Sequence, residues 1–122
     1  MNKELCRKVG EVGQDNLIAK LFPPAETFGI KVAGGEGVLK RGTVMALSGT
    51  AYVVLDAEAT GKANCVLSDP VDASGESPVT AVAYRTGHLN RKALIVAEGY
   101  TMTAADEEEL RKGGILLSDM LD

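Results

Sequence analysis

Hydrophobic and polar residues alternate in the segment that follows a pair of prolines. Phe28, Ile30 and Val32 fall on one side of an extended chain, and the residues between them fall on the other side. This alternation predicts a strand with one face to bury over residues 27–32. A glycine-rich turn is expected next, at 34–37, because glycine adopts positive φ angles without steric cost.

Further apolar runs predict more strands, and turn-forming residues separate them. The run at 38–47 is interrupted at Gly42, where a β-bulge is expected. The polar stretch at 69–78 predicts a long loop, and Gly87 marks a connection between two strands. Six or so short strands with turns between them predict an all-β fold, a small barrel or sandwich. The remaining expected strands are residues 52–55, 64–68, 79–84 and 93–98.

One short helix is signalled near the C-terminal end. Thr103 is a favourable N-cap, and Asp106 stands three residues later in a variant of the capping box. Acidic residues in the first turn and basic residues in the last turn complement the helix dipole, and Gly113 is placed to supply a left-handed C-cap. A helix this short is not stable alone, so we expect it to pack on the sheet. The apolar residues 115–117 should form a final strand or dock in the core.

The first 26 residues lack the alternating pattern of the rest of the chain. They predict a flexible N-terminal arm at 1–26 ahead of a β-rich domain at 27–122. Residues 1–16 are polar, mixed in charge and without a clear period. A short apolar cluster follows at 17–22 and stops at the two prolines, which lack the backbone donors that a helix or central strand needs. We expect no secretory signal, because the segment has no apolar core and no small-residue cleavage site.

Composition narrows the range of partners. The chain has 122 residues, of which 45% are hydrophobic and 25% charged, as is ordinary for one globular domain. Its net charge is −4 and only 4% of residues are aromatic, so neither nucleic acid nor an anionic membrane surface is an expected partner. The apolar runs are too short to cross a bilayer. Cys6 and Cys65 lack the spacing of a metal or redox pair and are expected to be free thiols.

Candidate groups for catalysis or ligand binding are few. His88 is the only histidine, which excludes a histidine-rich metal site, and its polar surroundings predict a surface or hydrogen-bonded role. Asp69, Asp72 and Glu76 lack the regular spacing of a calcium loop. We therefore expect no enzyme activity, no cofactor and no metal. One alternative stays open, a small-molecule-binding barrel, for which His88, Arg85 and Asp72 are the available cluster.

An interaction surface is the function that these exclusions leave. An arm that orders on binding loses roughly 1–2 kcal/mol of conformational entropy per residue. Burial of apolar side chains, at about 25 cal/mol per Å², offsets part of that loss. The half-apolar strand at 27–32 could also pair with an edge of another chain. The residues expected to make this contact are Leu17, Ile18, Leu21, Phe22, Phe28 and Ile30.

Several stretches of the chain share their order and spacing with one known family. They are VLKRGTV at 38–44, CVLSDPVD at 65–72, PVTAVAY at 78–84, TGHLN at 86–90, and the C-terminal block 94–121 with LRKGGI at 110–115. Together these stretches resemble the bacteriophage head decoration proteins, typified by the capsid decoration protein of phage lambda. The resemblance begins near residue 33 and covers most of the chain.

The resemblance implies a fold of the β-clip type and a structural protein on the outer surface of the virion. It implies a homotrimer at the local threefold sites of the expanded head, bound to the major capsid protein with help from the N-terminal arm. Such a protein would be made in the bacterial host cytoplasm, and it would cement the head against the pressure of packed DNA without catalysis. A similar fold could serve another virion part, a head fibre base or a tail component, and this alternative stays open.

Overall fold

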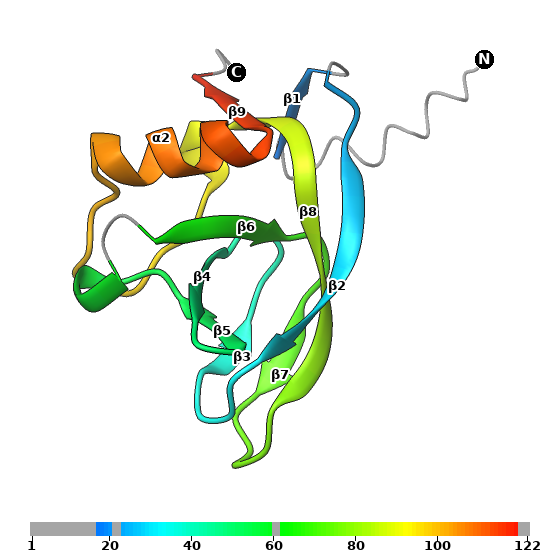
Figure 1. The fold of residues 1–122 in the computed structure, drawn as a ribbon, viewed down its shortest axis with the longest axis vertical. Helices are drawn as coiled ribbons and strands as arrows, with labels where there is room; N and C mark the ends of the chain where they lie inside the picture. Colours follow the sequence, from blue (N-terminus) through cyan, green and yellow to red (C-terminus); the bar gives the residue numbers. More distant parts are fainter. Residues whose placement is uncertain (1–16, 21–22, 60–61, 120–122) are drawn as a thin grey trace.

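The computed structural model describes residues 17–20, 23–59 and 62–119 (Figure 1). Short strands and one short α-helix make up these residues, so the predicted all-β fold with one helix near the C-terminal end is confirmed. None of the described helices is long and apolar enough to span a membrane. The strands are β1 (Ile18–Lys20), β2 (Glu26–Val32), β3 (Gly37–Leu39), β4 (Val44–Ser48), β5 (Ala51–Val54), β6 (Ala63–Leu67), β7 (Val71–Ala73), β8 (Val79–Asn90) and β9 (Ile115–Ser118). The helices are the 3₁₀ turns η2 (Ala57–Ala59) and η3 (Arg91–Ala93) and the α-helix α2 (Ala104–Gly113).

The long strand β8 organises the main sheet. Its first half pairs antiparallel with β2, and β5, β4 and β6 follow in that order. β6 then returns to β8, where Val66 pairs with Tyr84. The strands β8, β2, β5, β4 and β6 therefore close on themselves as a small barrel, which removes the open sheet edges that a flat arrangement would expose.

β8 continues without interruption through Gly87. The prediction of a connection at this glycine was therefore wrong. At Gly87 the strand leaves β2 and begins to pair with β1 on one side and β9 on the other. The φ angle of Gly87 is +150°, a conformation that residues with a side chain rarely adopt. Glycine here marks a change of partners within one strand, not the end of the strand.

Two hydrophobic cores fill the molecule. We call the first the terminal core, because it contains residues from the first and last strands and from α2. Its buried members are Leu17, Val44, Ala46, Leu55, Ala59, Ala63, Val66, Tyr84, Leu89, Leu110 and Ile115. The second, the ribbon core, lies toward β3 and β7, and its buried members are Ile30, Val32, Leu39, Met45, Cys65, Leu67, Ala73, Ala81 and Ala83.

β3 and β7 form a two-stranded antiparallel ribbon at the opposite end of the molecule from β1 and β9 (Figure 1). This ribbon corrects two predictions, because the run at 38–47 is not one bulged strand and the stretch at 69–78 is not all loop. The chain turns at Gly42, whose φ is +98°, between β3 and β4. A Cβ atom on Gly42 would lie 2.9 Å from the carbonyl oxygen of Ala93. Gly42 thus permits both the turn and the close approach of another segment.

Residues 93–98, which were predicted to be a strand, do not form one. Asn90 Oδ1 accepts a hydrogen bond from the Lys92 nitrogen at 3.1 Å and so starts the turn η3. The segment then makes one isolated parallel bridge, between Ile95 and Thr43. The capping side chain of Asn90 favours a turn where the apolar pattern alone suggested an extended strand.

The helix α2 confirms the predicted capping. Thr103 Oγ1 accepts from the Asp106 nitrogen at 3.2 Å, and Asp106 Oδ2 accepts from the Thr103 nitrogen at 2.9 Å. The C-cap is Gly114, with a φ of +111°, and not Gly113 as predicted. Leu110 points from the helix into the terminal core, which is the packing that a helix of this length needs.

Candidate functional site

The two ends of the described chain meet on one three-stranded sheet, which we call the terminal sheet. It consists of β1, residues 87–90 of β8, and β9. β1 runs antiparallel to β8 and β9 runs parallel to it, so that Leu89 is paired with a residue on each side. The Asn90 nitrogen donates to the Leu17 carbonyl oxygen at 2.7 Å. The chain therefore enters β1 and leaves β9 beside the same end of β8.

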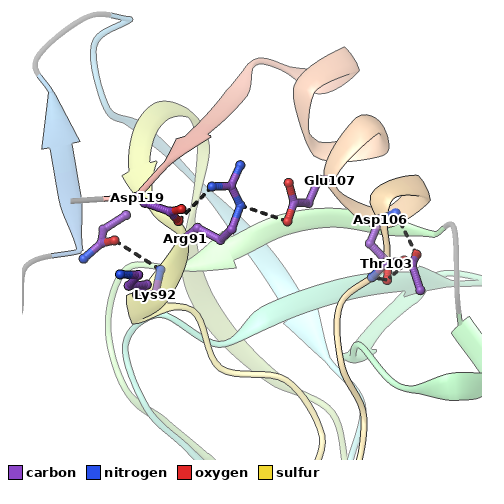
Figure 2. A network of polar contacts seen from close by, with 7 residues as sticks. Arg91, Lys92, Thr103, Asp106, Glu107 and Asp119 are labelled. Carbon is purple, nitrogen blue, oxygen red and sulfur yellow. Dashed lines mark hydrogen bonds and ion pairs between the residues drawn. The ribbon is translucent and has the colours of Figure 1, made fainter. Parts of the chain in front are cut away.

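Arg91 ties the terminal sheet to α2, as Figure 2 shows. Its Nε donates to Glu107 Oε2 on the helix at 3.0 Å, and a terminal nitrogen donates to Asp119 Oδ1, just beyond β9, at 2.8 Å. Hydrogen bonds to Glu107 and then to Asp119 raise the pKa of Arg91. The three side chains keep exposed fractions of 38%, 30% and 54%. Solvent therefore screens this clamp, and its expected contribution to stability is modest.

A buried carboxylate fixes the start of α2. Asp106 is fully buried, and its Oδ2 accepts hydrogen bonds from the Tyr100 hydroxyl, the Thr103 nitrogen and the Thr103 hydroxyl. A buried charge without such donors would cost several kcal/mol. The cluster holds the segment before the helix against the helix itself (Figure 2). This cluster has a structural role, because it anchors the helix α2, which carries Glu107.

A groove of about 400 Å³ lies between α2 and the terminal sheet. At its edge, His88 Nε2 and Ser118 Oγ are 3.1 Å apart and share a hydrogen bond. Within the described part of the chain no carboxylate bonds to His88, so the orienting group of a catalytic triad is missing there. The described residues also contain no group of ligating side chains that could hold a metal ion. The groove can therefore bind a partner through its shape and its charged lining.

The structure separates the apolar residues that were expected to form one contact surface. Leu17 is buried in the terminal core, and Ile18 packs half-buried against it. Ile30 is buried in the ribbon core, and Phe28 packs half-buried against that core. Leu21 and Phe22 lie outside the described residues. The four described side chains therefore divide between two cores and do not form one exposed patch.

The cluster considered for a small-molecule site does not come together. Asp72 belongs to β7 in the ribbon, whereas His88 bonds to β9 at the other end of the molecule (Figure 1). Asp72 Oδ1 instead accepts from the nitrogen and hydroxyl of Ser74, and these hydrogen bonds lower its pKa. Arg85 is exposed on β8 and does not line the groove that contains His88. The geometry gives this alternative no convergent polar site.

Cys65 is a free cysteine in the ribbon core, as predicted for both thiols. Burial raises the pKa of Cys65 to about 12. The thiol therefore stays protonated near neutral pH and is not a nucleophile. Cys6 lies outside the described residues.

A second groove, which sequence reasoning missed, lies beside the ribbon and has a volume of about 590 Å³. We call it the ribbon groove; β3, β5 and residues 95–98 line it. Val38 is 72% exposed at this groove and Ile95 is 39% exposed. Both residues sit in runs that the sequence predicts as half-buried strands, so the pattern gave no sign that their side chains would face solvent.

Comparison with known proteins identifies one family. The family model described as bacteriophage lambda head decoration protein D matches residues 23–115, well over half of the chain. The match begins after β1 and ends at the first residue of β9. No curated protein matches the chain. The matched span contains the whole barrel and the ribbon, and it omits the segment that includes Leu17.

Proposed function

Because the chain belongs to the family of bacteriophage lambda head decoration protein D, we propose that it binds the outside of the expanded phage head and stabilises it against internal DNA pressure. The family match is the observation that carries this proposal. Its setting is the phage capsid, with synthesis in the cytoplasm of the bacterial host. A head decoration family also favours this role over a head fibre base or a tail component.

A structural, non-catalytic role agrees with the chemistry of the described residues. The fully buried carboxylate of Asp106 caps a helix, the buried thiol of Cys65 stays protonated, and His88 bonds to a serine without an orienting acid. The function we propose requires a stable body with binding surfaces. The closed barrel, its two cores and the clamped helix supply such a body.

We place the contact with the major capsid protein at the terminal sheet and the arm, residues 1–26. The described chain begins at Leu17, whose carbonyl oxygen accepts from the Asn90 nitrogen, so residues 1–16 are joined in sequence to the terminal sheet. Leu17 and Ile30 would support the contact indirectly, because their buried side chains anchor β1 and β2 in the two cores. Leu21, Phe22 and the exposed parts of Ile18 and Phe28 would supply the apolar area that offsets the entropy of ordering the arm.

We further propose that the protein acts as a homotrimer at the local threefold sites of the head. A specific protein contact buries about 1,200–2,000 Å² in total, and three copies on one site would triple the shell contacts that each arm makes alone. Linking three weak contacts in one assembly strengthens attachment without any new contact.

The test uses phage heads that lack the protein. Purified full-length chain should bind expanded heads in co-sedimentation and raise the temperature at which they release DNA. Removal of residues 1–16 should leave the barrel folded, because Leu17 and β1 remain, but should weaken or abolish head binding. Removal of 1–26 should abolish binding and also destabilise the body.

The outcomes separate the two parts of the proposal. Absence of binding by the full-length chain to any matching head would refute the decoration function. Full binding by the chain without residues 1–16 would refute the role of the arm and leave the decoration function standing. Circular dichroism of each variant shows whether the body is folded.

A further inference from the structure

The ribbon groove combines exposed apolar side chains with a negatively charged rim. Val38 and Ile95 present their side chains to solvent, with exposed fractions of 72% and 39%. The carboxylates on the rim belong to Glu36, Asp56 and Glu98, against one cation, Lys40. An apolar groove with an excess of negative charge fits a partner surface that is apolar at its centre and positive around it.

Glu36 is already held in place at this groove. Its Oε1 accepts a hydrogen bond from the Val54 nitrogen at 2.9 Å, which fixes the turn before β3 against β5. The rim is therefore built before any partner arrives, and a partner would not lose much entropy in ordering it.

A second exposed surface, which is positively charged where the ribbon groove is negatively charged, lies on the outer face of the β2–β8 pair. We call this surface the ladder face. Val82 is 38% exposed there and lies directly opposite Gly29, which leaves its side chain uncovered. Lys31 is exposed on this face, and Arg85 is exposed where the pairing register shifts near the end of the β2–β8 pair. Neither cation has an ion-pair partner within residues 17–20, 23–59 and 62–119.

The one carboxylate of β2, Glu26, is exposed at the end of the ladder face. The segments 27–31 and 80–85 contain no aspartate or glutamate. Inward-pointing residues such as Ala81 and Ala83 fill the ribbon core, so only the alternate residues face outward. The ladder face therefore presents one exposed valine, Val82, and one cation, Lys31, and its charge is opposite to that of the ribbon groove.

We propose that the ladder face of one subunit docks on the ribbon groove of a second copy of this chain. Val82 would meet Val38 and Ile95, and Lys31 would lie near the carboxylates of the rim. Because the two surfaces differ, the contact is head-to-tail, and it forms a closed ring when its rotation closes. The inference rests on the proposed trimer and specifies which surfaces make it.

A foreign partner explains these surfaces less well. Either surface alone could bind an unrelated protein. The presence of both complementary halves on one chain, on different faces, is what a head-to-tail homo-oligomer requires. The terminal sheet takes no part in this contact, so the subunit contact and the proposed shell contact use separate surfaces.

Cross-linking on heads and in concentrated solution tests the contact. In a Cys6→Ser background, Cys65 stays buried and unreactive, and a double variant Val82→Cys/Ile95→Cys carries one new thiol on each surface. A short bis-maleimide should link this variant into dimers and trimers and into nothing larger. The single variants Val82→Cys and Ile95→Cys should give no dimer, because each thiol faces the other surface. The control Val82→Cys/Lys112→Cys moves the second thiol to the exposed end of α2 and should give no trimer.

A charge placed in the contact gives a second readout. Adding Val38→Glu to the Val82→Cys/Ile95→Cys variant keeps both thiols and should lower the linked fraction by at least about tenfold, because the contact would then bury an unpaired charge. Absence of trimers both on heads and in solution would overturn the inference, and so would dimers from the single Val82→Cys variant, which report a symmetric contact.

Head binding is measured separately. If the wild-type chain binds heads but no trimer is linked, only the inference fails; if it does not bind, the decoration function fails.

Discussion

The terminal core and the ribbon core are stabilised in different ways. The terminal core collects residues that are distant in sequence, among them Leu17, Leu55 and Ile115, and polar clusters around Asp106 and Arg91 close it. The ribbon core is built from residues between 30 and 83, and none of its buried members is charged. The two ends of the described chain therefore contribute to the terminal core only.

This difference has a consequence for binding at the terminal sheet. A partner that displaces β1 would remove Leu17 from the terminal core but leave the ribbon core intact. The barrel and the subunit contact inferred above could then persist while the end of the molecule rearranges. Four substitutions or conditions test how sharply the two halves are separated.

The largest effect is expected from Leu17→Ala. Leu17 is 2% exposed, and truncation of a buried leucine costs about 2–5 kcal/mol. We expect the free energy of unfolding, measured with urea, to fall by about 3 kcal/mol. The control Val38→Ala removes an exposed side chain from the ribbon and should change stability by less than about 0.5 kcal/mol. A cost for Leu17→Ala as small as that of the control would mean that the N-terminal segment does not belong to the terminal core.

Asp106→Ala should have the next largest effect. It leaves the donors of Tyr100 and Thr103 without their buried acceptor, for an expected loss of about 2 kcal/mol. Asp72→Ala is a matched control in the ribbon, because Asp72 also accepts hydrogen bonds from a neighbouring backbone nitrogen and hydroxyl but is exposed. Its loss should stay below about 0.5 kcal/mol. Equal losses of unfolding free energy for the two variants would show that burial does not set the contribution of these two aspartates.

The pH dependence of stability probes the ribbon core. The pKa of Cys65 is raised from its ordinary value of 9.0 to about 12, so in this range the folded protein keeps the proton that the unfolded chain loses. Stability should therefore fall as pH rises above about 9, by roughly 1 kcal/mol between pH 9 and pH 10. Cys65→Ala should lack this component. Burial and then the Cys65 charge also raise the pKa of Tyr52, so the difference between wild type and variant reports the thiol together with its effect on Tyr52. Identical slopes for the two proteins would contradict the prediction.

The smallest effect is expected from Arg91→Met. The clamp is partly exposed, so its loss should cost about 0.5–1 kcal/mol and less in high salt. Hydrogen exchange should nevertheless speed up in β9, because Asp119 is no longer held to α2. Lys112→Met removes an exposed pair with Glu109 on the helix surface and should leave exchange in β9 unchanged. Faster exchange in the ribbon strands would show that the two halves are coupled.

Local signals account for the parts of the fold that the sequence predicted. The alternation at 27–32 and the capping of α2 by Thr103 and Asp106 depend on neighbours within a few residues, and the structure contains both. The three-residue strand β7 is too short for a periodic signal. The break between β3 and β4 depends on a close approach of Ala93 to Gly42, which no local pattern encodes.

The candidate site was harder to predict than the fold. Arg91 meets Glu107 and Asp119 across 16 and 28 positions of sequence, and only the folded chain brings them together. The burial of Leu17 depends on β1 pairing with the far half of β8, which a break expected at Gly87 concealed. Val38 is exposed because it lies in a ribbon that the sequence did not predict, and Ile95 is exposed because the segment 93–98 is not the strand that was predicted.

The direction of the strands in the terminal sheet bears on mechanical load. Because β1 runs antiparallel and β9 parallel to β8, Leu17, the residue before β1, and Ser118, the last residue of β9, lie beside the same residue, Asn90. A pulling force applied at residue 17 along the strand direction would load the hydrogen bonds between β1 and β8 at the same time, in shear. It would not break them one after another. A shell that swells beneath such an attachment would pull on the barrel along the direction in which its end strands resist sliding.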